Sequence, residues 1–286
     1  MHIYRQAKSL QKQYRGAVIA VGNFDGIHRG HRTVIGEAGS IAAAARLPWG
    51  VLTFEPHPRA VFQPDVAPFR LTPFRDKAEQ IAGLGVDFMI AQRFDLAFSK
   101  QSAGAFVNHY LAETLHVHHV VAGYDFRFGH KRQGSCETLL SEGQKLGFGF
   151  TVVAAASDDG GGLYSSSRCR ELIADGDVRA AADILGRPFE ISGRVAGGDK
   201  RGRTIGFPTA NLALRDYIRP AFGVYAIRAH LPDGRSVDGV ANLGMRPTFN
   251  GTAPRLEVHL FNFDADIYDV RIRVALLEMI RAEKKF

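Results

Sequence analysis

Two histidines stand close together in the segment GNFDGIHRGH, which covers residues 22–31 and follows the apolar run AVIAV. His28 and His31 are three residues apart, so at the start of a helix both rings can face the same anion. Backbone N–H groups at a helix start also attract anions. The segment is therefore a candidate phosphate site suited to nucleotidyl transfer, in which charge builds on the phosphates. A tight glycine turn with two structural histidines is the alternative.

A second glycine-rich segment, GRVAGGDKRGRTIGFPTANL, covers residues 193–212. Its glycines and basic side chains favour a loop whose backbone surrounds phosphates, although a solvated hairpin has a similar composition. Neither segment matches the dinucleotide pattern GxGxxG or the P-loop pattern GxxxxGK[ST]. The candidate phosphate-binding residues of the second segment are Gly193, Gly198, Lys200 and Gly206.

Short apolar runs alternate with segments of helical period from residue 17 to about residue 186. Nearly continuous apolar runs favour strands that are buried on both faces of a parallel sheet. The pattern predicts a doubly wound, Rossmann-like α/β domain, in which the first strand-to-helix turn is the usual phosphate site. The predicted strands cover 17–22, 49–54, 87–92, 118–124 and 150–156, and the predicted helices cover 30–46, 74–84, 101–115, 135–147 and 165–186.

After residue 187 the chain changes to strand-like runs separated by Gly, Pro and Asp turns. This spacing predicts an antiparallel β-barrel or sandwich. Gly186 and Pro188 are typical of a helix end, so we expect one domain over 1–186 and a second over 187–286. The predicted strands cover 189–195, 223–231, 236–244, 255–263 and 270–279.

The pattern GxFDGxHxGH resembles the ATP-binding signature of the nucleotidyltransferase superfamily, and YSSSRCREL resembles its second signature, S-[ST]-x-x-R. Residues 52–77 and 123–134 resemble the flavin-side and nucleotide-side loops of bacterial FMN adenylyltransferase domains, with Ser135 standing where an Asp is expected. The resemblance implies ATP binding by Gly22, Asn23, Phe24, Asp25, Gly26, His28, His31, Ser166, Ser167 and Arg170. It also implies flavin or nucleotide contacts by His57, Pro58, Arg59, Asp125 and Arg127.

The run FPTAN resembles the riboflavin kinase signature. This resemblance implies that Thr209 and Asn211 hold Mg²⁺ and the nucleotide phosphates, and that Glu257 in RLEVHLFNF is the general base. As part of a bare amphipathic strand, Glu257 would instead face solvent. Two departures are that Asp269 stands where a Gly usually follows the Tyr, and that the chain ends at RAEKKF, where relatives continue into a C-terminal helix. That helix is expected to be missing.

The motifs together identify the chain as a member of the bacterial bifunctional riboflavin kinase and FMN adenylyltransferase (FAD synthetase) family. The resemblance implies that the barrel phosphorylates riboflavin to FMN with ATP, and that the first domain adenylylates FMN to FAD with release of pyrophosphate, both with Mg²⁺. In one alternative the barrel only binds flavin, because of Asp269 and the shortened end. In another, the basic barrel binds nucleic acid, although RNP-like aromatic residues are absent.

The composition fits an enzyme with small anionic substrates. The chain has 286 residues, of which 45% are hydrophobic and 23% charged, and a net charge of +7 that favours anionic partners such as nucleotides, nucleic acid or membrane surfaces. Its two cysteines are too few for a disulfide scaffold or a four-cysteine zinc site. We expect a cytoplasmic protein with no export signal, membrane span or nucleic-acid partner, acting as a monomer or weak homo-oligomer.

Overall fold

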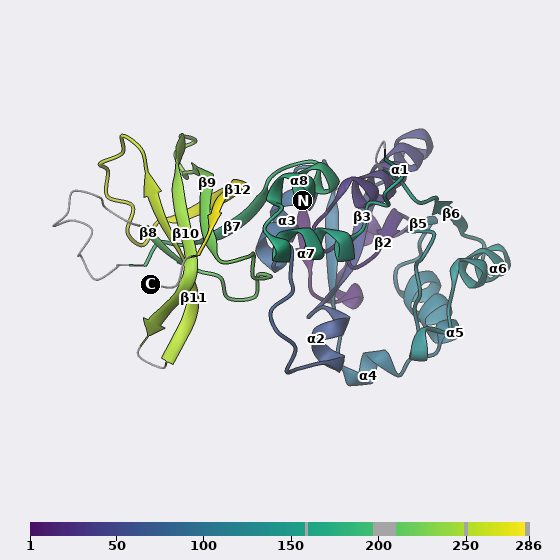
Figure 1. Ribbon diagram of the computed structural model, residues 1–286. Helices are drawn as coiled ribbons and strands as arrows, with labels where there is room; N and C mark the ends of the chain where they lie inside the picture. Colours follow the sequence, from purple (N-terminus) through teal and green to yellow (C-terminus); the bar gives the residue numbers. More distant parts are fainter. Residues whose placement is uncertain (158–159, 197–209, 249–250, 284–286) are drawn as a thin grey trace. The chain divides into compact units, whose positions relative to one another are not determined.

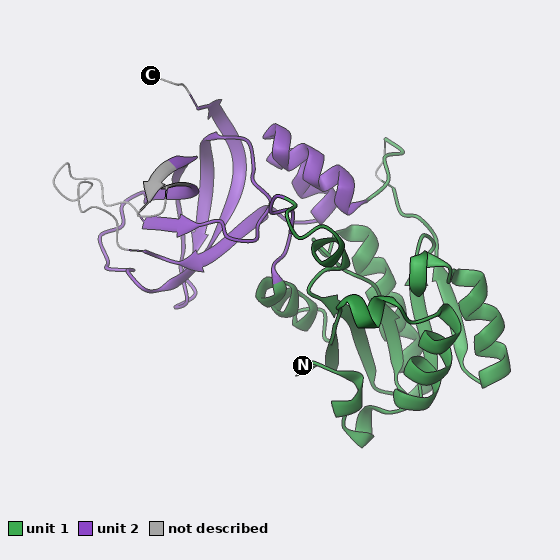
Figure 2. Cartoon of the chain, turned by 90° about the horizontal axis from the view of Figure 1, so that it is seen from below, with its two compact units in different colours: residues 1–66, 74–164 green, residues 67–73, 165–286 purple. Residues whose placement is uncertain are grey.

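The chain forms two compact units. The computed structural model describes residues 1–157, 160–196, 210–248 and 251–283. The first unit contains Met1–Val66 and Phe74–Tyr164, and the second contains Ala67–Pro73 and Ser165–Phe286 (Figure 2). The contacts therefore divide before Ser165, while the expected functional boundary near residue 187 stays a prediction. Within the described ranges, no helix has the length and apolar character that crossing a membrane requires.

A six-stranded parallel sheet forms the centre of the first unit, in the order β1-β4-β3-β2-β5-β6. Strands β3, β2, β5 and β6 of this sheet are labelled in Figure 1. The predicted α/β fold is confirmed, and the sequence analysis missed only the short first strand of this sheet. That strand is largely exposed and is held by its pairing with β4. A pairing with a distant segment cannot be predicted from the local sequence. The strands are β1 (His2–Tyr4), β2 (Val18–Val21), β3 (Trp49–Glu55), β4 (Phe88–Arg93), β5 (His119–Gly123) and β6 (Gly149–Val153).

The helices of the first unit lie mostly where the helical period predicts them, at 30–46, 74–84 and 135–147. The segment predicted as one helix over 101–115 is instead a short helix followed by a π-helix. The helices are α1 (Arg29–Ala45), α2 (Pro58–Phe62), α3 (Phe74–Ala82), α4 (Leu96–Ser99), α5 (Ala103–Ala105), the π-helix η3 (Phe106–Thr114) and α6 (Cys136–Leu146). Single 3-10 turns occur at η1 (Ala7–Ser9), η2 (Lys12–Tyr14) and η4 (His130–Arg132).

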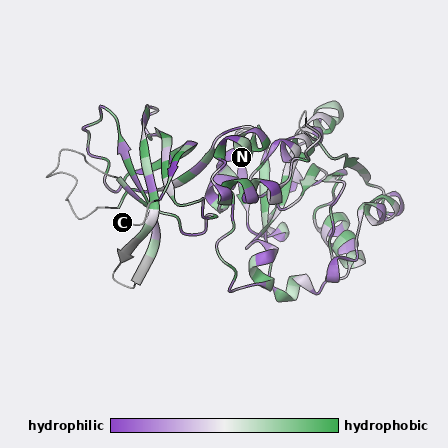
Figure 3. Cartoon of the chain, viewed as in Figure 1, coloured by the Kyte–Doolittle hydropathy of each residue, from purple (hydrophilic) through white to green (hydrophobic). Residues whose placement is uncertain are grey.

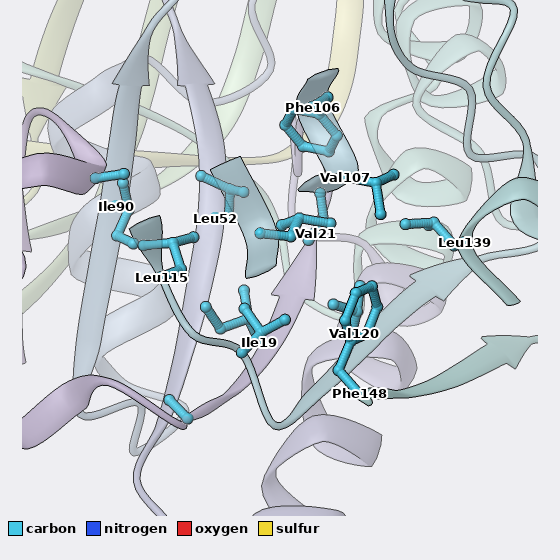
Figure 4. Packing of buried hydrophobic residues seen from close by; sticks show 14 of the residues in the cluster. Ile19, Val21, Leu52, Ile90, Phe106, Val107, Leu115, Val120, Leu139 and Phe148 are labelled. Carbon is cyan, nitrogen blue, oxygen red and sulfur yellow. The ribbon is translucent and has the colours of Figure 1, made fainter. Parts of the chain in front are cut away.

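Strand β2 is buried on both faces, which explains its uninterrupted apolar sequence. On one face, Ile19 and Val21 pack in a cluster with Leu52 and Phe106 (Figure 4). On the other face, Val18 and Ala20 belong to a separate cluster that includes the inner side of α1. Hydrophobic residues are accordingly gathered on the central strands of this unit (Figure 3). The packed sheet fixes the point at which β2 ends and the loop of residues 22–28 begins.

An antiparallel sheet of six strands forms the second unit, in the order β7-β12-β9-β10-β11-β8. Its two edge strands approach each other through a bridge between Ala196 and Asn211, so the sheet is a nearly closed barrel. The predicted antiparallel barrel is confirmed. The strands are β7 (Phe189–Arg194), β8 (Ala210–Ala213), β9 (Gly223–His230), β10 (Ser236–Thr248), β11 (Gly251–Leu260) and β12 (Arg271–Ala282).

The helix predicted over 165–186 is divided into α7 (Ser166–Asp175) and α8 (Val178–Leu185). Gly176 ends α7 in the left-handed conformation, with φ of 89°, which costs glycine no strain. The carboxylate of Asp177 then accepts a hydrogen bond from the Ala180 N–H at 2.9 Å and begins α8. The Gly-Asp pair therefore stops one helix and starts the next.

The turn before β12 contains Asp269, which stands where the family resemblance predicts a Gly. Its φ is 60°, in the left-handed region that Gly adopts freely and that Asp tolerates better than most residues. The Asp269 N–H donates to the Val195 carbonyl at 2.9 Å, and the Asp269 carbonyl accepts from Arg194 Nη1 at 2.6 Å. Asp269 thus stands in a backbone conformation that a Gly would adopt without strain.

We predict that Asp269→Val lowers the free energy of unfolding by about 1–2 kcal/mol, because a β-branched residue is strained at positive φ. Differential scanning calorimetry measures the change. Asp264→Val is the matched control, since Asp264 is an exposed residue of the same connection without a positive φ. Equal unfolding temperatures for the two variants would contradict this explanation of Asp269.

Candidate functional site

The two histidines of the first motif lie together at the amino end of α1. His28 is the N-cap residue, and its Nδ1 accepts a hydrogen bond from the His31 N–H at 3.3 Å. The two imidazole rings stack with their centroids 3.6 Å apart, and the ring of Phe24 lies edge-on against His31. With Nδ1 of His28 as the acceptor, a neutral ring carries its proton on Nε2. The two rings thus lie together at the helix start, and their contact with an anion stays a prediction.

The loop before α1 has an unusual backbone. Phe24, Gly26 and Ile27 have φ values of 48°, 90° and 44°. Glycine adopts this region freely, whereas a β-branched residue such as Ile27 does so only under constraint from its surroundings. The constraint comes from the core, because the side chains of Phe24 and Ile27 are buried in the same cluster as Val34 and Ile35. Two anchored side chains thus hold the loop in a strained shape.

Two small residues of the motif leave room for its rings. A Cβ atom on Gly22 would lie 3.0 Å from the ring of Phe24, and one on Gly30 would lie 3.3 Å from the ring of His28. Asp25 is buried, whereas the side chain of Asn23 is exposed. The carbonyl oxygen of Asn23 accepts hydrogen bonds from Thr53 Oγ1 at 3.1 Å and Lys77 Nζ at 2.8 Å. Lys77 is therefore a neighbour of the motif that the sequence analysis did not single out.

The segment after β3 reaches the same edge of the sheet, because β2 and β3 are parallel neighbours. His57 is the N-cap of α2, and its Nδ1 accepts from the Arg59 N–H at 3.1 Å. Pro58 is the first residue of that helix, where its missing N–H costs nothing. The guanidinium of Arg59 donates to Gln63 Oε1 at 3.3 Å. These residues form a local helix start beside the end of β3.

The segment after β5 also lies at this edge, since β5 is the other parallel neighbour of β2. Asp125 and Arg127 are exposed there. Ser135, found where an Asp was expected, is the N-cap of α6, and its N–H donates to Thr138 Oγ1 at 3.2 Å. Its hydroxyl donates to the Glu137 carboxylate, which lowers the pKa of Glu137. Ser and Asp both suit an N-cap, so the helix start tolerates the exchange.

The second nucleotidyltransferase motif belongs to the second unit. Ser165 caps α7 by accepting from the Arg168 N–H at 3.2 Å, which places Ser166 and Ser167 in the first turn. Arg170 Nε donates to the Phe69 carbonyl at 2.9 Å, and its guanidinium lies 5.6 Å from the centroid of the Phe69 ring. Arg170 thereby ties Ala67–Pro73 to α7 within this unit.

In the barrel, Glu257 of β11 lies between two asparagines. It is the Cα partner of Asn211 on β8 and of Asn242 on β10, so the three side chains leave the sheet on the same face. Leu256 and Val258 are fully buried on the opposite face. Asn211 is only 5% exposed. The sequence pattern predicted the alternation of β11 but could not show that Asn242 belongs to the same row.

The rest of the second glycine-rich segment is described only in part. Gly193 pairs with Ile272, and a Cβ on Gly193 would lie 3.2 Å from the Leu212 side chain. Gly198, Lys200, Gly206 and Thr209 lie outside the described residues.

The comparisons with known proteins match two different families to the two parts of the chain. A family profile described as FAD synthetase matches residues 10–168, and one described as riboflavin kinase matches residues 185–286. A bifunctional riboflavin kinase/FMN adenylyltransferase of Haemophilus influenzae is 40% identical over 286 residues, covering 100% of this chain and 92% of the relative. The chain belongs to this family. The protein of the same description from Escherichia coli K12 is 41% identical over 276 residues, covering 96% of this chain and 88% of the relative.

A solved structure described as a macrolide-efflux protein from Streptococcus pneumoniae also matches. It has a TM-score of 0.86 and 31% sequence identity, and the match covers 99% of this chain and 92% of that chain. The family expected from the motifs and the expected fold class are confirmed by these findings.

We predict that Gly30→Ala displaces the His28 ring, because the added methyl would lie 3.3 Å from that ring and 3.5 Å from the Tyr164 carbonyl. Two-dimensional NMR of the imidazole C–H groups detects the displacement. Gly36→Ala in the same helix is the control, since a Cβ there meets no atom within 4 Å. It should stabilise the protein by roughly 1 kcal/mol, whereas Gly30→Ala should gain less. Equal gains and unshifted His28 signals would contradict the prediction.

Proposed function

We propose that this chain makes FAD from riboflavin in two ATP-dependent steps, with a kinase centre in the barrel and an adenylyltransferase centre at the end of β2. Family membership supports both activities. The assignment of residues rests on one observation: Glu257 pairs with Asn211 on the neighbouring strand. This pairing places the candidate base beside a candidate ligand for Mg²⁺ and the phosphates. The stacking of His28 on His31 supports the adenylyltransferase centre, because it brings two candidate phosphate ligands together.

In the kinase step, Glu257 takes the proton of the riboflavin 5′-hydroxyl as that oxygen attacks the γ-phosphorus of ATP. The bond from the γ-phosphorus to its bridging oxygen breaks, and ADP leaves. Asn211 lies directly opposite Glu257 and presents an amide to the phosphates on the same face of the barrel. The backbone donors expected from the glycine-rich segment that begins with Gly193, including the contributions of Gly198, Lys200, Gly206 and Thr209, stay predictions.

The oxygen donors at this centre fit Mg²⁺, a hard cation that retains several waters and phosphate oxygens. Asn211 would hold the ion through its amide oxygen, together with Thr209. Among the residues that the structure describes, no three His, Cys, Asp or Glu side chains are grouped as a protein-made metal cage would require. Magnesium that enters with ATP fits this sparse donor set, and when bound it neutralises phosphate charge in both steps.

In the adenylyl-transfer step, a phosphate oxygen of FMN attacks the α-phosphorus of ATP, and pyrophosphate leaves. His28 and His31 donate to the phosphates, while the N–H groups at the amino end of α1 meet the charge that builds during transfer. The ATP phosphates approach the backbone of the loop formed by Gly22, Asn23, Phe24, Asp25 and Gly26. His57, Pro58, Arg59, Asp125 and Arg127 contact flavin or nucleotide, and Ser166, Ser167 and Arg170 are kept as predicted ATP ligands.

A time course from riboflavin, ATP and Mg²⁺, resolved by HPLC, tests the proposal. FMN should form first and FAD should follow at its expense, while without Mg²⁺ neither should form. FAD from FMN but never from riboflavin would instead support a barrel that only binds flavin. Salt-dependent RNA binding without flavin turnover would support the nucleic-acid alternative. Cytoplasmic location and a monomer or weak homo-oligomer remain predictions.

We predict reciprocal losses from two substitutions. His31→Ala should lower FAD formation from FMN by about 100-fold or more and spare FMN formation, because it removes a donor to the transferring phosphate. Glu257→Ala should lower FMN formation by about 100-fold or more and spare FAD formation from FMN. Steady-state rates of the two half-reactions measure the losses. His109→Ala and Glu278→Ala, both at exposed side chains, are the controls. Loss of both activities from either single change in folded protein would refute the two-centre assignment.

A further inference from the structure

A completely buried lysine lies beside the loop that carries the two histidines. Lys77 belongs to α3, and its side chain is 0% exposed. Its ammonium donates to the Asn23 carbonyl at 2.8 Å, to Glu55 Oε1 at 2.9 Å and to Thr53 Oγ1 at 3.3 Å. Three acceptors thus surround a group that has three protons to donate.

Packing alone does not call for a lysine at this position. Of the other buried residues of α3, Ala78 and Ile81 are apolar members of the core, and Asp76 is a carboxylate that is 8% exposed. A buried ammonium is costly to desolvate unless it is paired and hydrogen-bonded, and the Glu55 carboxylate, only 12% exposed, supplies the pairing charge. The lysine therefore requires a dedicated set of partners, and those partners come from the ends of β2 and β3.

The Asn23 carbonyl is the part of the phosphate loop that Lys77 touches. This oxygen also accepts from Thr53 Oγ1 at 3.1 Å, so two donors fix the orientation of the peptide between Asn23 and Phe24. Phe24 is the first of the left-handed residues, and the loop ends at the N-cap His28. The orientation of that peptide fixes the start of the strained loop, and the N-cap at His28 fixes its end.

We propose that Lys77 is a positioning residue for adenylyl transfer. By holding the Asn23 carbonyl, it keeps residues 22–31 in the shape in which their N–H groups and the two histidines meet the ATP phosphates. Because Glu55 directly precedes Pro56 and His57, the same ammonium also ties the end of β3 to this loop. The inference rests on the proposed adenylyl-transfer function, and Lys77 acts through Asn23, without contact with substrate.

Lys77→Met tests the proposal, since methionine is similar in length but has neither charge nor donors. The KM for ATP in FAD formation from FMN should rise about 10- to 100-fold, because small displacements of binding groups have effects of this size. The KM for ATP in riboflavin phosphorylation should stay unchanged. A role in folding alone would lower the active fraction, and therefore the apparent kcat, and leave the KM of the folded molecules as it was.

Thr53→Val is the second variant, since it removes one of the two donors to the same carbonyl, together with one acceptor of the Lys77 ammonium, and keeps Lys77 as the other donor. It should raise the KM for ATP in FAD formation by a smaller factor, and it decides the question if Lys77→Met does not fold. Lys145→Met is the matched control. Lys145 pairs with Glu142 at 2.7 Å on α6, but its side chain is 68% exposed, so both activities should be unchanged.

An unchanged KM for ATP in the folded variants would overturn the inference, as would a lower kcat with no change in KM. Failure of the proposed function gives a different result, because the unaltered protein would then make no FAD from FMN. If the unaltered protein is active and Lys77→Met raises the KM for ATP only in adenylyl transfer, the positioning role is supported.

Discussion

The peptide between Asn23 and Phe24 is the point on which the first centre depends. Strand β2 is buried on both faces, so its direction is fixed, and the chain must turn into α1 with three left-handed residues. Such a turn persists only where its surroundings determine it. Buried side chains secure it from the core, and donors to the Asn23 carbonyl secure it from the neighbouring strand. The stacked histidines are held in place as a consequence.

The two proposed centres meet phosphates by different means, although neither uses a P-loop. The first is proposed at the amino end of a helix of 17 residues, where the two stacked imidazoles also lie. The second places polar side chains in one row across three strands, with Glu257 between Asn211 and Asn242. Proton removal from an alcohol needs a base, whereas a phosphate nucleophile is already ionised. The proposal of a general base in the kinase centre alone follows this difference.

The local sequence predicted the elements whose burial repeats regularly along the chain. Strand β2 is an unbroken apolar run because helices cover both faces, and α1 follows the helical period. Contacts between distant segments escaped prediction. Strand β1 is held by β4, and Lys77 donates hydrogen bonds to Asn23 and Glu55, which precede it by 54 and 22 positions. A local sequence pattern cannot predict such contacts. The division at Gly176 was missed because a single glycine inside a helical pattern is often tolerated. Family resemblance made Glu257 a candidate base, and strand pairing shows that Asn242 lies beside it.

The row across β8, β11 and β10 has a consequence for how the barrel assembles. Side chains alternate along a strand, so a slip of one residue in the pairing of β11 would turn Glu257 into the apolar interior and expose Leu256 and Val258. A charge buried in this way would destabilise the misaligned barrel. The carboxylate of Glu257, the proposed base, therefore also disfavours a misaligned β11. Because the same residue is proposed for catalysis, kinase activity should be lost when β11 pairs out of register.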